Sequence, residues 1–327
     1  MKLPRFFGRA AGVMALALVV SACAPAAAPT PPPVGEDDPP YIAIISKGWM
    51  HQFWQAVEQG ALAEAERLGA EVSYEGPATE ADIDDQLTML RTAIDKNPDA
   101  ICFAALDSMA AIPLLERAQA AGIPIIAFDS GVDSDIPLTT VATDNVAAAA
   151  VAADKMAELI NEEGQVALVV HDMTSVTGIT RRDGFVNRMA EAYPNVEIVA
   201  IEYGGGDPLR SADLARAIMA ANPDLKGFFG ANEGSAKGIL TALRETGREN
   251  QIVAIGYDSG AQQITAIRDG VMAGAITQNP IGIGAKCVSA AMDAIAGETL
   301  PLFIDTGFFW YDRTNIDDPE IQAVLYQ

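Results

Sequence analysis

The feature that most constrains the fold is a regular alternation, from Tyr41 onward, of short apolar runs with longer segments of helical periodicity. Runs such as YIAIIS (41–46) and QVALVV (165–170) are apolar over nearly their whole length. Continuous apolar runs are typical of parallel strands buried on both faces, with the intervening helices as cover. The sequence therefore predicts an α/β fold built from doubly wound parallel sheets. The expected strands are 41–46, 71–76, 100–106, 123–128, 138–143, 165–170, 196–203, 226–230, 251–257 and 273–278.

The start of the chain has the organisation of an export signal. Basic residues precede an apolar run over 10–20, and the sequence Val20-Ser21-Ala22-Cys23 follows. This order is typical of a secretory signal peptide, here 1–22, because the run falls short of the roughly 20 apolar residues that cross a bilayer. Small residues before a single cysteine resemble the lipobox of bacterial lipoproteins, which implies lipidation of Cys23. An ordinary signal peptide with a coincidental cysteine is the alternative.

A Pro- and Ala-rich stretch, 23–40, follows and contains little that a core could bury. Its prolines favour an extended chain of about 3.1 Å per residue, so the stretch could hold the remaining chain up to roughly 50 Å from a membrane. We therefore expect a lipid-anchored, extracytoplasmic protein of the cell envelope or periplasm.

The charge and the metal-ligating residues exclude several functions. With 44 acidic and 21 basic residues, the chain carries a formal charge of −23. A nucleic-acid binder needs a basic surface, so a nucleic-acid partner is excluded. The two histidines, His51 and His171, have no metal-binding spacing, so we expect no metal and no cofactor. Cys102 lies in an apolar run and Cys287 in a helical pattern, so both are expected to be buried free thiols, with a disulfide between them as the alternative.

Polar residues that directly follow the expected strands are the candidate functional residues. Open α/β sheets bind ligands beyond the carboxyl ends of their strands. The strand-end residues are Lys47, Trp49, His51, Asp107, Ser108, Asp129, Ser130, Asp144, Asn145, His171, Asp172, Thr174, Gly204, Gly205, Gly206, Asn232, Glu233, Asp258, Gln278 and Asn279.

This set is rich in Asp, Asn and Gln, and the aromatic pair Phe53 and Trp54 lies near the first strand end. Hydroxyl groups both donate and accept hydrogen bonds, which carboxylates and amides match. The C–H face of a sugar ring packs on an aromatic plane. The chemistry indicates a neutral polyol ligand. The chain shows no nucleophile elbow, P-loop or GxGxxG, so no catalytic residue is expected.

Seven segments, in this order and spacing, resemble the ribose/galactose-type (type I) periplasmic sugar-binding proteins of ABC transporters. They are KGWMHQFWQAVEQGA (47–61), FDSG (128–131), ATDN (142–145), TRRDGF (180–185), GANEGSAKGIL (230–240), GYDSG (256–260) and TQNP (277–280). The resemblance implies two doubly wound lobes joined by a three-crossover hinge, with the sugar in the cleft. The lobes would comprise 41–143 plus 279–305 and 144–278 plus 306–327.

The resemblance also implies roles for individual residues. Phe53 and Trp54 match the family's aromatic pair, which borders the sugar. Asp129 matches the carboxylate that takes two ring hydroxyls, and Arg181 matches an arginine of the second lobe that bonds the ring oxygen and hydroxyls. The remaining polar contacts are matched by Asn232, Asp258 and Gln278.

Several positions depart from the ribose-binding pattern. Ser130 stands where ribose binders carry an arginine, and Gly206 where they carry an aromatic residue. Lys47 and His51 stand where they carry small polar groups, and both are candidate ligand contacts. A hexose, a different pentose, a polyol or a sugar acid therefore remain open as ligands.

Together these features predict a monomeric, lipid-anchored substrate-binding protein. It would capture a monosaccharide by hinge closure and deliver it to an ABC permease in the membrane. A receptor of the same fold for a nucleoside, a polyol or a quorum-sensing furanose is the alternative. An extracytoplasmic enzyme is less favoured, because no nucleophile–base pair is evident.

Overall fold

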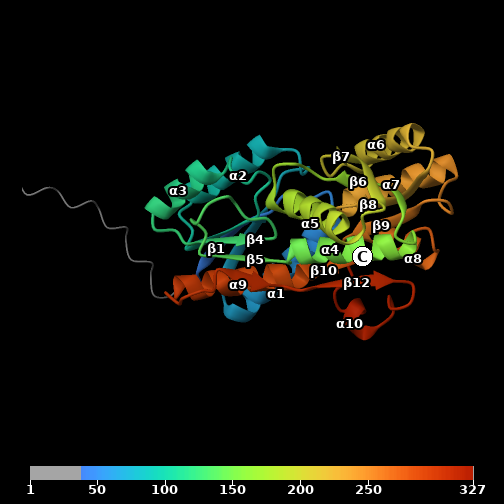
Figure 1. Ribbon diagram of the computed structural model, residues 1–327. Coiled ribbons are helices and arrows are strands. Elements are labelled where there is room, and N and C mark those ends of the chain that lie inside the picture. The colour runs from blue at the N-terminus through green and yellow to red at the C-terminus, as the bar shows by residue number, and fades with distance from the viewer. Residues whose placement is uncertain (1–37, 327) are drawn as a thin grey trace, which may run out of the picture. The chain divides into compact units, whose positions relative to one another are not determined.

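The strands of the computed structural model, which describes residues 38–326, form two separate sheets (Figure 1). The predicted signal peptide, Cys23 and most of the predicted tether lie outside the described residues. From Pro39 onward the chain forms one compact unit. Among the described residues, no helix combines the length and the apolar character that crossing a membrane requires.

All pairings of the first sheet are parallel, in the order β11-β5-β4-β3-β1-β2. Its strands are β1 (Tyr41–Ile45), β2 (Glu71–Glu75), β3 (Ala100–Phe103), β4 (Ile125–Phe128), β5 (Thr139–Ala142) and β11 (Phe303–Asp305). The second sheet has the order β12-β10-β9-β8-β6-β7, and only β12 runs antiparallel to its neighbour. Its strands are β6 (Gly164–Val170), β7 (Val196–Tyr203), β8 (Leu225–Gly230), β9 (Val253–Tyr257), β10 (Gly274–Gln278) and β12 (Phe308–Asp312).

Helices cover both faces of each sheet. The first sheet is covered by α1 (Gln52–Leu68) and α9 (Pro280–Ile295) on one face and by α2 (Ile83–Asp95) and α3 (Ile112–Ala120) on the other. The second sheet lies between α4 (Asn145–Leu159) with α5 (Val176–Ala192) and α6 (Pro208–Ala221) with α7 (Glu233–Thr246). The remaining helices, α8 (Ala261–Arg268) and α10 (Pro319–Gln322), also contribute to the core beside the second sheet.

The double cover explains why the inner strands β1, β3 and β4 are apolar over nearly their whole length. In β1, Ile42 and Ile44 point into the core under α1 and α9, whereas Ala43 and Ile45 point into the core under α2 and α3. Successive side chains of a strand alternate between the faces, so a sheet covered on both sides needs apolar residues at every position. The predicted fold class, with two doubly wound lobes, is confirmed.

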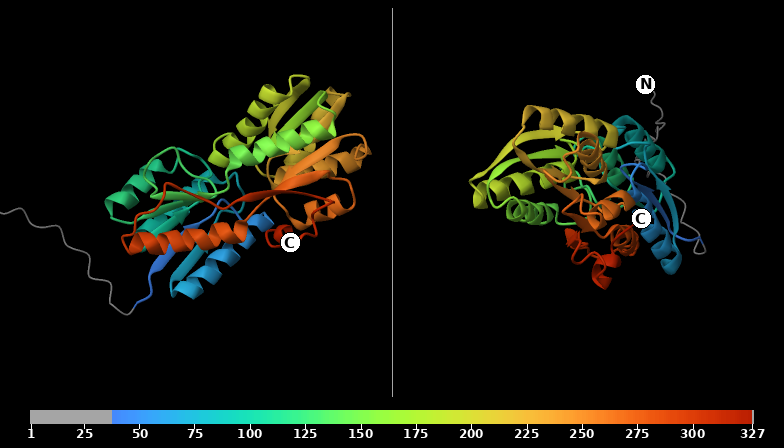
Figure 2. Two further views of the ribbon diagram at one scale, coloured as in Figure 1. Left: turned by 60° about the horizontal axis from the view of Figure 1, so that its bottom comes forward. Right: turned by 90° about the vertical axis from the view of Figure 1, so that its right-hand side faces the viewer.

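The chain passes between the sheets three times: after β5, after β10, and between β11 and β12 (Figure 2). The second passage returns α9 to the first lobe, where it packs closely on α1. A Cβ on Gly60 or Gly284 would overlap the backbone of the opposite helix, so glycine permits this contact. Near the C-terminus, Tyr326 packs into the core of the first lobe. The lobe limits 41–143 plus 279–305 and 144–278 plus 306–327 stay a prediction.

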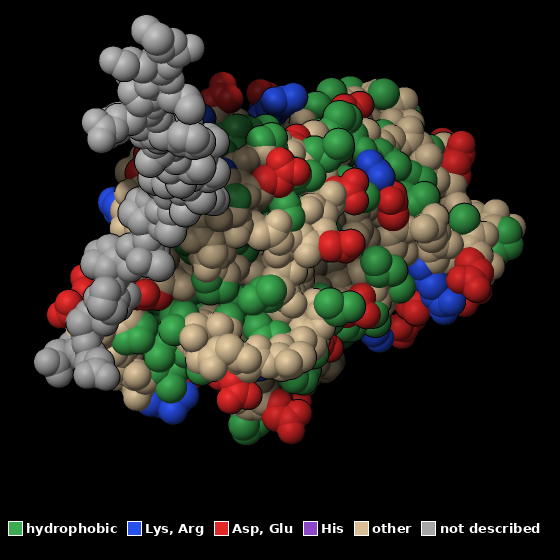
Figure 3. All heavy atoms as spheres, turned by 90° about the vertical axis from the view of Figure 1, so that its left-hand side faces the viewer, with side chains coloured by type: hydrophobic (Ala, Val, Ile, Leu, Met, Phe, Trp, Pro, Cys, Tyr) green, Lys and Arg blue, Asp and Glu red, His purple; other side chains and the backbone are tan. Residues whose placement is uncertain are grey.

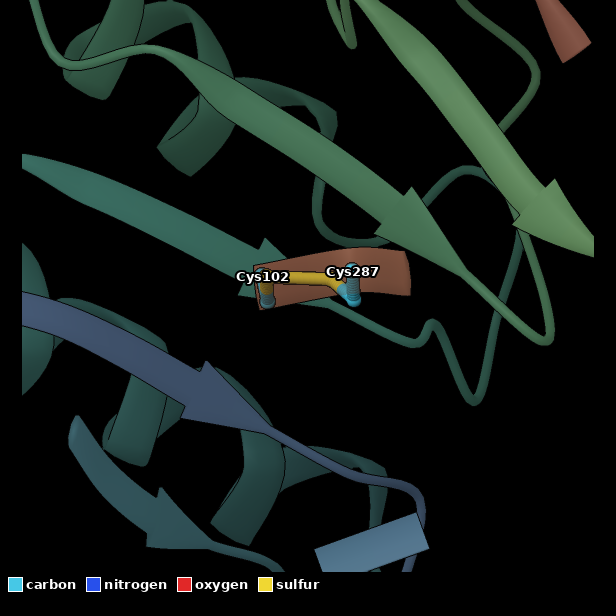
Figure 4. The surroundings of a disulfide bond; sticks show 2 residues. All are labelled: Cys102 and Cys287. Atoms are coloured by element: carbon cyan, nitrogen blue, oxygen red, sulfur yellow. A yellow bond between two sulfur atoms is a disulfide. The ribbon is translucent and has the colours of Figure 1, made fainter. Parts of the chain in front are cut away.

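The structure corrects the prediction that the two cysteines are free. Cys102 on β3 and Cys287 on α9 form a disulfide, shown in Figure 4, with their Cα atoms 6.4 Å apart. Both are buried as expected. The pairing was missed because the cysteines lie 185 residues apart and meet only after α9 has returned to the first lobe. Disulfides persist mainly in oxidising compartments, so the bond agrees with an exported protein.

On the face of the molecule that Figure 3 shows, acidic side chains are spread among fewer basic ones. This distribution follows from the formal charge of −23. Both histidines, in contrast, are buried.

The disulfide should contribute measurably to stability, because it closes a long loop in the unfolded chain. We expect the double variant Cys102→Ala/Cys287→Ala to lose about 2–4 kcal/mol of unfolding free energy in urea titrations. Reductant should destabilise the wild type and leave the double variant unchanged. A wild type whose unfolding midpoint is insensitive to reductant would contradict the bond.

Candidate functional site

The nine predicted ligand-binding residues line one cavity between the two lobes. About 270 Å³ between these side chains is not filled by protein atoms, a figure that includes space open to solvent. The predicted residues that line it are Lys47, His51, Phe53, Trp54, Asp129, Arg181, Asn232, Asp258 and Gln278. Three further residues line it: His171, which was a strand-end candidate but not a predicted ligand contact, and Glu80 and Thr177, which the prediction did not include.

Two aspartates occupy equivalent places in the two lobes. Asp129 directly follows β4 and Asp258 directly follows β9, and each has a positive φ, 55° and 78° respectively. Each backbone N–H still donates to the neighbouring strand, at Val141 and at Ile276. Aspartate tolerates this left-handed conformation better than most residues. The turn therefore ends each strand with a carboxylate at the cavity.

The two carboxylates differ in their partners. Asp258 accepts a hydrogen bond from Gln278 Nε2 at 2.8 Å and one from the backbone N–H of Glu233 at 2.9 Å. Asp129 accepts no side-chain hydrogen bond from the described residues. Burial raises the pKa of both carboxyl groups. The pKa of Asp129 rises to about 6, although the positive charges of Lys47 and Arg181 act to lower it. Asp129 is therefore a buried carboxylate with free acceptor capacity.

Arg181 on α5 is held in one orientation. Its Nε donates to Asn145 Oδ1 at 2.7 Å and its Nη1 to the Ala231 carbonyl at 3.0 Å. The guanidinium carbon lies 3.8 Å from the centre of the Tyr257 ring, which adds a cation–π contact. The buried cation is thus presented to the cavity with little freedom.

Phe53 and Trp54 form the aromatic wall. Their rings meet edge to face, with centroids 4.9 Å apart and an interplanar angle of 86°. Phe53 is backed by Tyr326 and Trp54 by Phe128. Although they are neighbours on the first turn of α1, both rings border the cavity.

Glu80 is the most connected of the residues that sequence reasoning missed. Its carboxylate accepts from Trp54 Nε1 at 2.8 Å and, across the cleft, from Asn232 Nδ2 at 3.3 Å, and it lies 3.8 Å from His51 Nε2. Burial alone would raise the pKa of Glu80, but His51, Lys47 and the Trp54 hydrogen bond outweigh it and lower the pKa to about 2. Glu80 follows β2 by five residues, so a search of the whole loop after that strand would have found it.

Lys47 reaches across the cleft from the end of β1. Its Nζ donates to Thr177 Oγ1 at 3.1 Å and to Ser175 Oγ at 3.4 Å, and lies 4.0 Å from Asp172. Beside it, His171 Nε2 lies 3.2 Å from Thr177 Oγ1. Burial lowers the pKa of His171 to about 3, so its ring is neutral at physiological pH. His171 is a strand-end residue that no family motif singled out.

Three buried polar atoms of the cavity lining have no hydrogen-bond partner among the described residues: His51 Nε2, His171 Nδ1 and Gln278 Oε1. Buried polar atoms are rarely left without a hydrogen bond. A ligand with several hydroxyl groups would supply the missing partners.

The glycine loop after β7 lies against two residues of the cavity lining, Glu80 and His51. A Cβ on Gly206 would lie 2.9 Å from Glu80 Oε2 and 3.4 Å from His51 Nε2, and Gly206 has a φ of 69°. A larger side chain is excluded there on both counts.

Comparison with known proteins agrees with this geometry. The model of the periplasmic binding protein domain family matches residues 42–299. The chain belongs to this family. The D-allose-binding periplasmic protein of Escherichia coli K12 is 28% identical, over 80% of this chain and 86% of its own length. The ribose import binding protein of the same organism is 27% identical, over 86% of this chain and 93% of its own length.

Solved structures of periplasmic binding proteins share the architecture. An ABC transporter solute-binding protein from Agrobacterium vitis with bound D-fucose is 33% identical, with a TM-score of 0.85 over 88% of this chain and 100% of its own. A carbohydrate transporter solute-binding protein from Agrobacterium radiobacter in complex with D-arabinose is 29% identical, with a TM-score of 0.85 over 88% and 99%. The resemblance inferred from the sequence is confirmed.

The raised pKa of Asp129 predicts a pH-dependent cost. A carboxyl group whose folded-state pKa lies above its unfolded value favours folding below about pH 4, and this advantage is lost as the pH rises through about 6. In ligand-free protein at about pH 7.5, Asp129→Asn should therefore raise the unfolding free energy to the extent that the lobes are closed, by at most about 3 kcal/mol, which corresponds to two pKa units.

The gain should shrink toward about pH 4.5, as urea titrations at the two pH values would measure. Asp133→Asn, an exposed aspartate in the following loop, is the control and should show no such difference. An equal gain for Asp129→Asn at both pH values would contradict the raised pKa.

Proposed function

We propose that the protein is the substrate-binding component of an ABC importer and that its ligand is a neutral monosaccharide. The observation that carries the proposal is the cavity between the lobes, to which both lobes contribute carboxylates, the second lobe adds two amides and Arg181, and the first lobe adds an aromatic wall. Relatives of the same family are named for allose and ribose binding, and solved neighbours contain D-fucose and D-arabinose.

The lining groups suggest how the sugar is held. Asp129 has free acceptor capacity for a pair of hydroxyl groups, and Arg181 is positioned to donate to ring and hydroxyl oxygens. Gln278 Oε1, His51 Nε2 and His171 Nδ1 offer further bonds. The C–H face of the ring would pack on the Phe53–Trp54 wall.

The charges of the lining favour a neutral sugar over a sugar acid. Three carboxylates, Glu80, Asp129 and Asp258, face two permanent cations, Lys47 and Arg181. A ligand carboxylate would enter a site whose carboxylates already outnumber Lys47 and Arg181, and it would lose its hydration on burial. A neutral polyol completes hydrogen bonds and adds no charge.

Hinge closure is the proposed mechanism. Lys47 binds Thr177, and Glu80 binds Asn232, so that contacts from the two lobes meet around the cavity. A ligand that touches both lobes stabilises the closed state through these shared contacts. The closed form would then dock on the membrane permease. We propose a monomeric and non-catalytic role, in line with relatives that are named binding proteins.

The extracytoplasmic location fits the family and the disulfide. We propose that 1–22 is a signal peptide and that Cys23 carries the lipid. The stretch 23–40 would tether the receptor beside its permease. Cys23→Ala should move the mature protein from the membrane pellet to the soluble fraction in fractionated cells. An unchanged membrane fraction would contradict lipidation.

Isothermal titration against neutral monosaccharides, with nucleosides and polyols in the same panel, tests the ligand class. We expect a monosaccharide to bind, and Asp129→Ala and Arg181→Ala each to weaken its binding by about 100-fold, because each leaves ligand groups without a charged partner. Asp133→Ala and Arg182→Ala, exposed or partly exposed neighbours, are the matched controls. Heat from nucleosides alone, or normal affinity in both cavity variants, would overturn the assignment.

A further inference from the structure

Two helices that face each other across the cleft lack a cap from their own N-cap residue. Helix α1 begins at Gln52, and its N-cap His51 makes no side-chain cap bond. Helix α8 begins at Ala261, and its N-cap is Gly260, which has no side chain. Five other helices of the unit are capped in the usual way, by Asp144, Ser175, Asp207, Asn232 and Asn279. The first N–H groups of α1 and α8 need partners from elsewhere.

Each missing cap is supplied by the opposite lobe. The carboxylate of Glu233, on α7 of the second lobe, accepts from the backbone N–H of Gln52 at 3.4 Å and of Phe53 at 3.3 Å. In return, Gln52 Oε1 of the first lobe accepts from the backbone N–H of Ala261 at 2.9 Å. Each lobe thus provides one side chain that caps a helix N-terminus of the other lobe.

The surroundings are shaped for this exchange. Glu233 is fully buried, and Lys237, one turn further along α7, forms an ion pair with it. A Cβ on Gly260 would lie 2.9 Å from Glu233 Oε1 and 3.2 Å from Gln52 Oε1. The absent side chain of Gly260 is therefore what allows the two capping side chains to meet. A buried carboxylate that bonds a helix N-terminus also interacts favourably with the helix dipole.

Glu233 also connects these capping bonds to two residues of the cavity lining, one in each lobe. Glu233 binds the N–H of Phe53, whose ring borders the cavity, and its own N–H donates to Asp258 Oδ2 at 2.9 Å. One residue therefore fixes an aromatic contact of the first lobe relative to a carboxylate of the second.

We propose that Gln52 and Glu233 form a reciprocal capping latch that stabilises the closed state and positions Phe53 and Asp258 around the ligand. For its effect on sugar affinity the proposal rests on the function proposed above. The latch bonds join the lobes, so they form whenever the lobes close, with or without sugar, and break on opening. They should slow dissociation of the sugar and leave its association rate unchanged.

Stopped-flow tryptophan fluorescence, to which Trp54 in the cavity lining contributes, measures both rates. We expect Glu233→Ala to raise the dissociation rate about tenfold, or about 1.4 kcal/mol, with an association rate close to that of the wild type. Glu233→Gln, which keeps one acceptor oxygen, and Gln52→Ala should each raise it about threefold. The matched controls are Glu245→Ala, an exposed and ion-paired glutamate near the other end of α7, and Gln59→Ala, an exposed glutamine on α1.

A purely structural role gives a different result. If Glu233→Ala and Gln52→Ala lower the melting temperature but keep the wild-type dissociation rate, the latch is overturned. The latch is also overturned if the variants lose the same stability with and without sugar. That result would mean that the bonds lie at the pivot of the hinge and persist when the lobes open.

A ligand-free measurement separates the latch from the sugar assignment. Spin labels at Thr88→Cys and Asn250→Cys, exposed positions in the two lobes, report the distance between the lobes. Without sugar, Glu233→Ala should shift this distance distribution toward longer values than in the wild type. If no sugar binds the wild type but this shift occurs, the proposed ligand is wrong and the latch stands. Identical distributions would overturn the latch.

Discussion

The structure depends on charged and polar side chains that are buried where the two lobes meet. Ionised groups are costly to bury unless they are paired and hydrogen-bonded. Here the pairing crosses the cleft, from Lys47 to Thr177 and from Glu80 to Asn232. The pairing is incomplete, because Gln278 Oε1 and other cavity atoms have no partner among the described residues. A polyhydroxylated ligand completes it, which is why burial of polar groups, strand-end geometry and closure all lead to the same ligand class.

The lobes themselves were predictable because parallel sheets leave a strong trace in sequence. In β1 the side chains of Ile42 and Ile44 pack into one core and those of Ala43 and Ile45 into the other. The strand is therefore apolar at every one of these positions, with no alternation of apolar and polar residues. Strand ends then place polar residues at one edge, and this rule found Asp129 and Asp258 before any contact was known. The roles of Arg181 and of the aromatic wall needed the family resemblance, because neither directly follows a strand.

Features that depend on the return of distant segments were not predictable. The disulfide joins β3 to a helix that returns to the first lobe, and the two cysteines are 185 residues apart. No local sequence pattern indicates that they lie close together. Glu80 sits deep in a loop, and Thr177 lies inside α5, so neither is a strand-end residue. Glu233 was a strand-end residue, but its role in capping α1 becomes visible only when the lobes are together.

The central claim is that a neutral monosaccharide closes two lobes around itself. Small-angle X-ray scattering of the full mature chain, with and without a saturating monosaccharide from the titration panel, measures this directly. The account predicts a smaller radius of gyration with the sugar, and no change with a sugar that fails to bind in calorimetry. A bound sugar that leaves the radius of gyration unchanged would contradict closure as the mechanism.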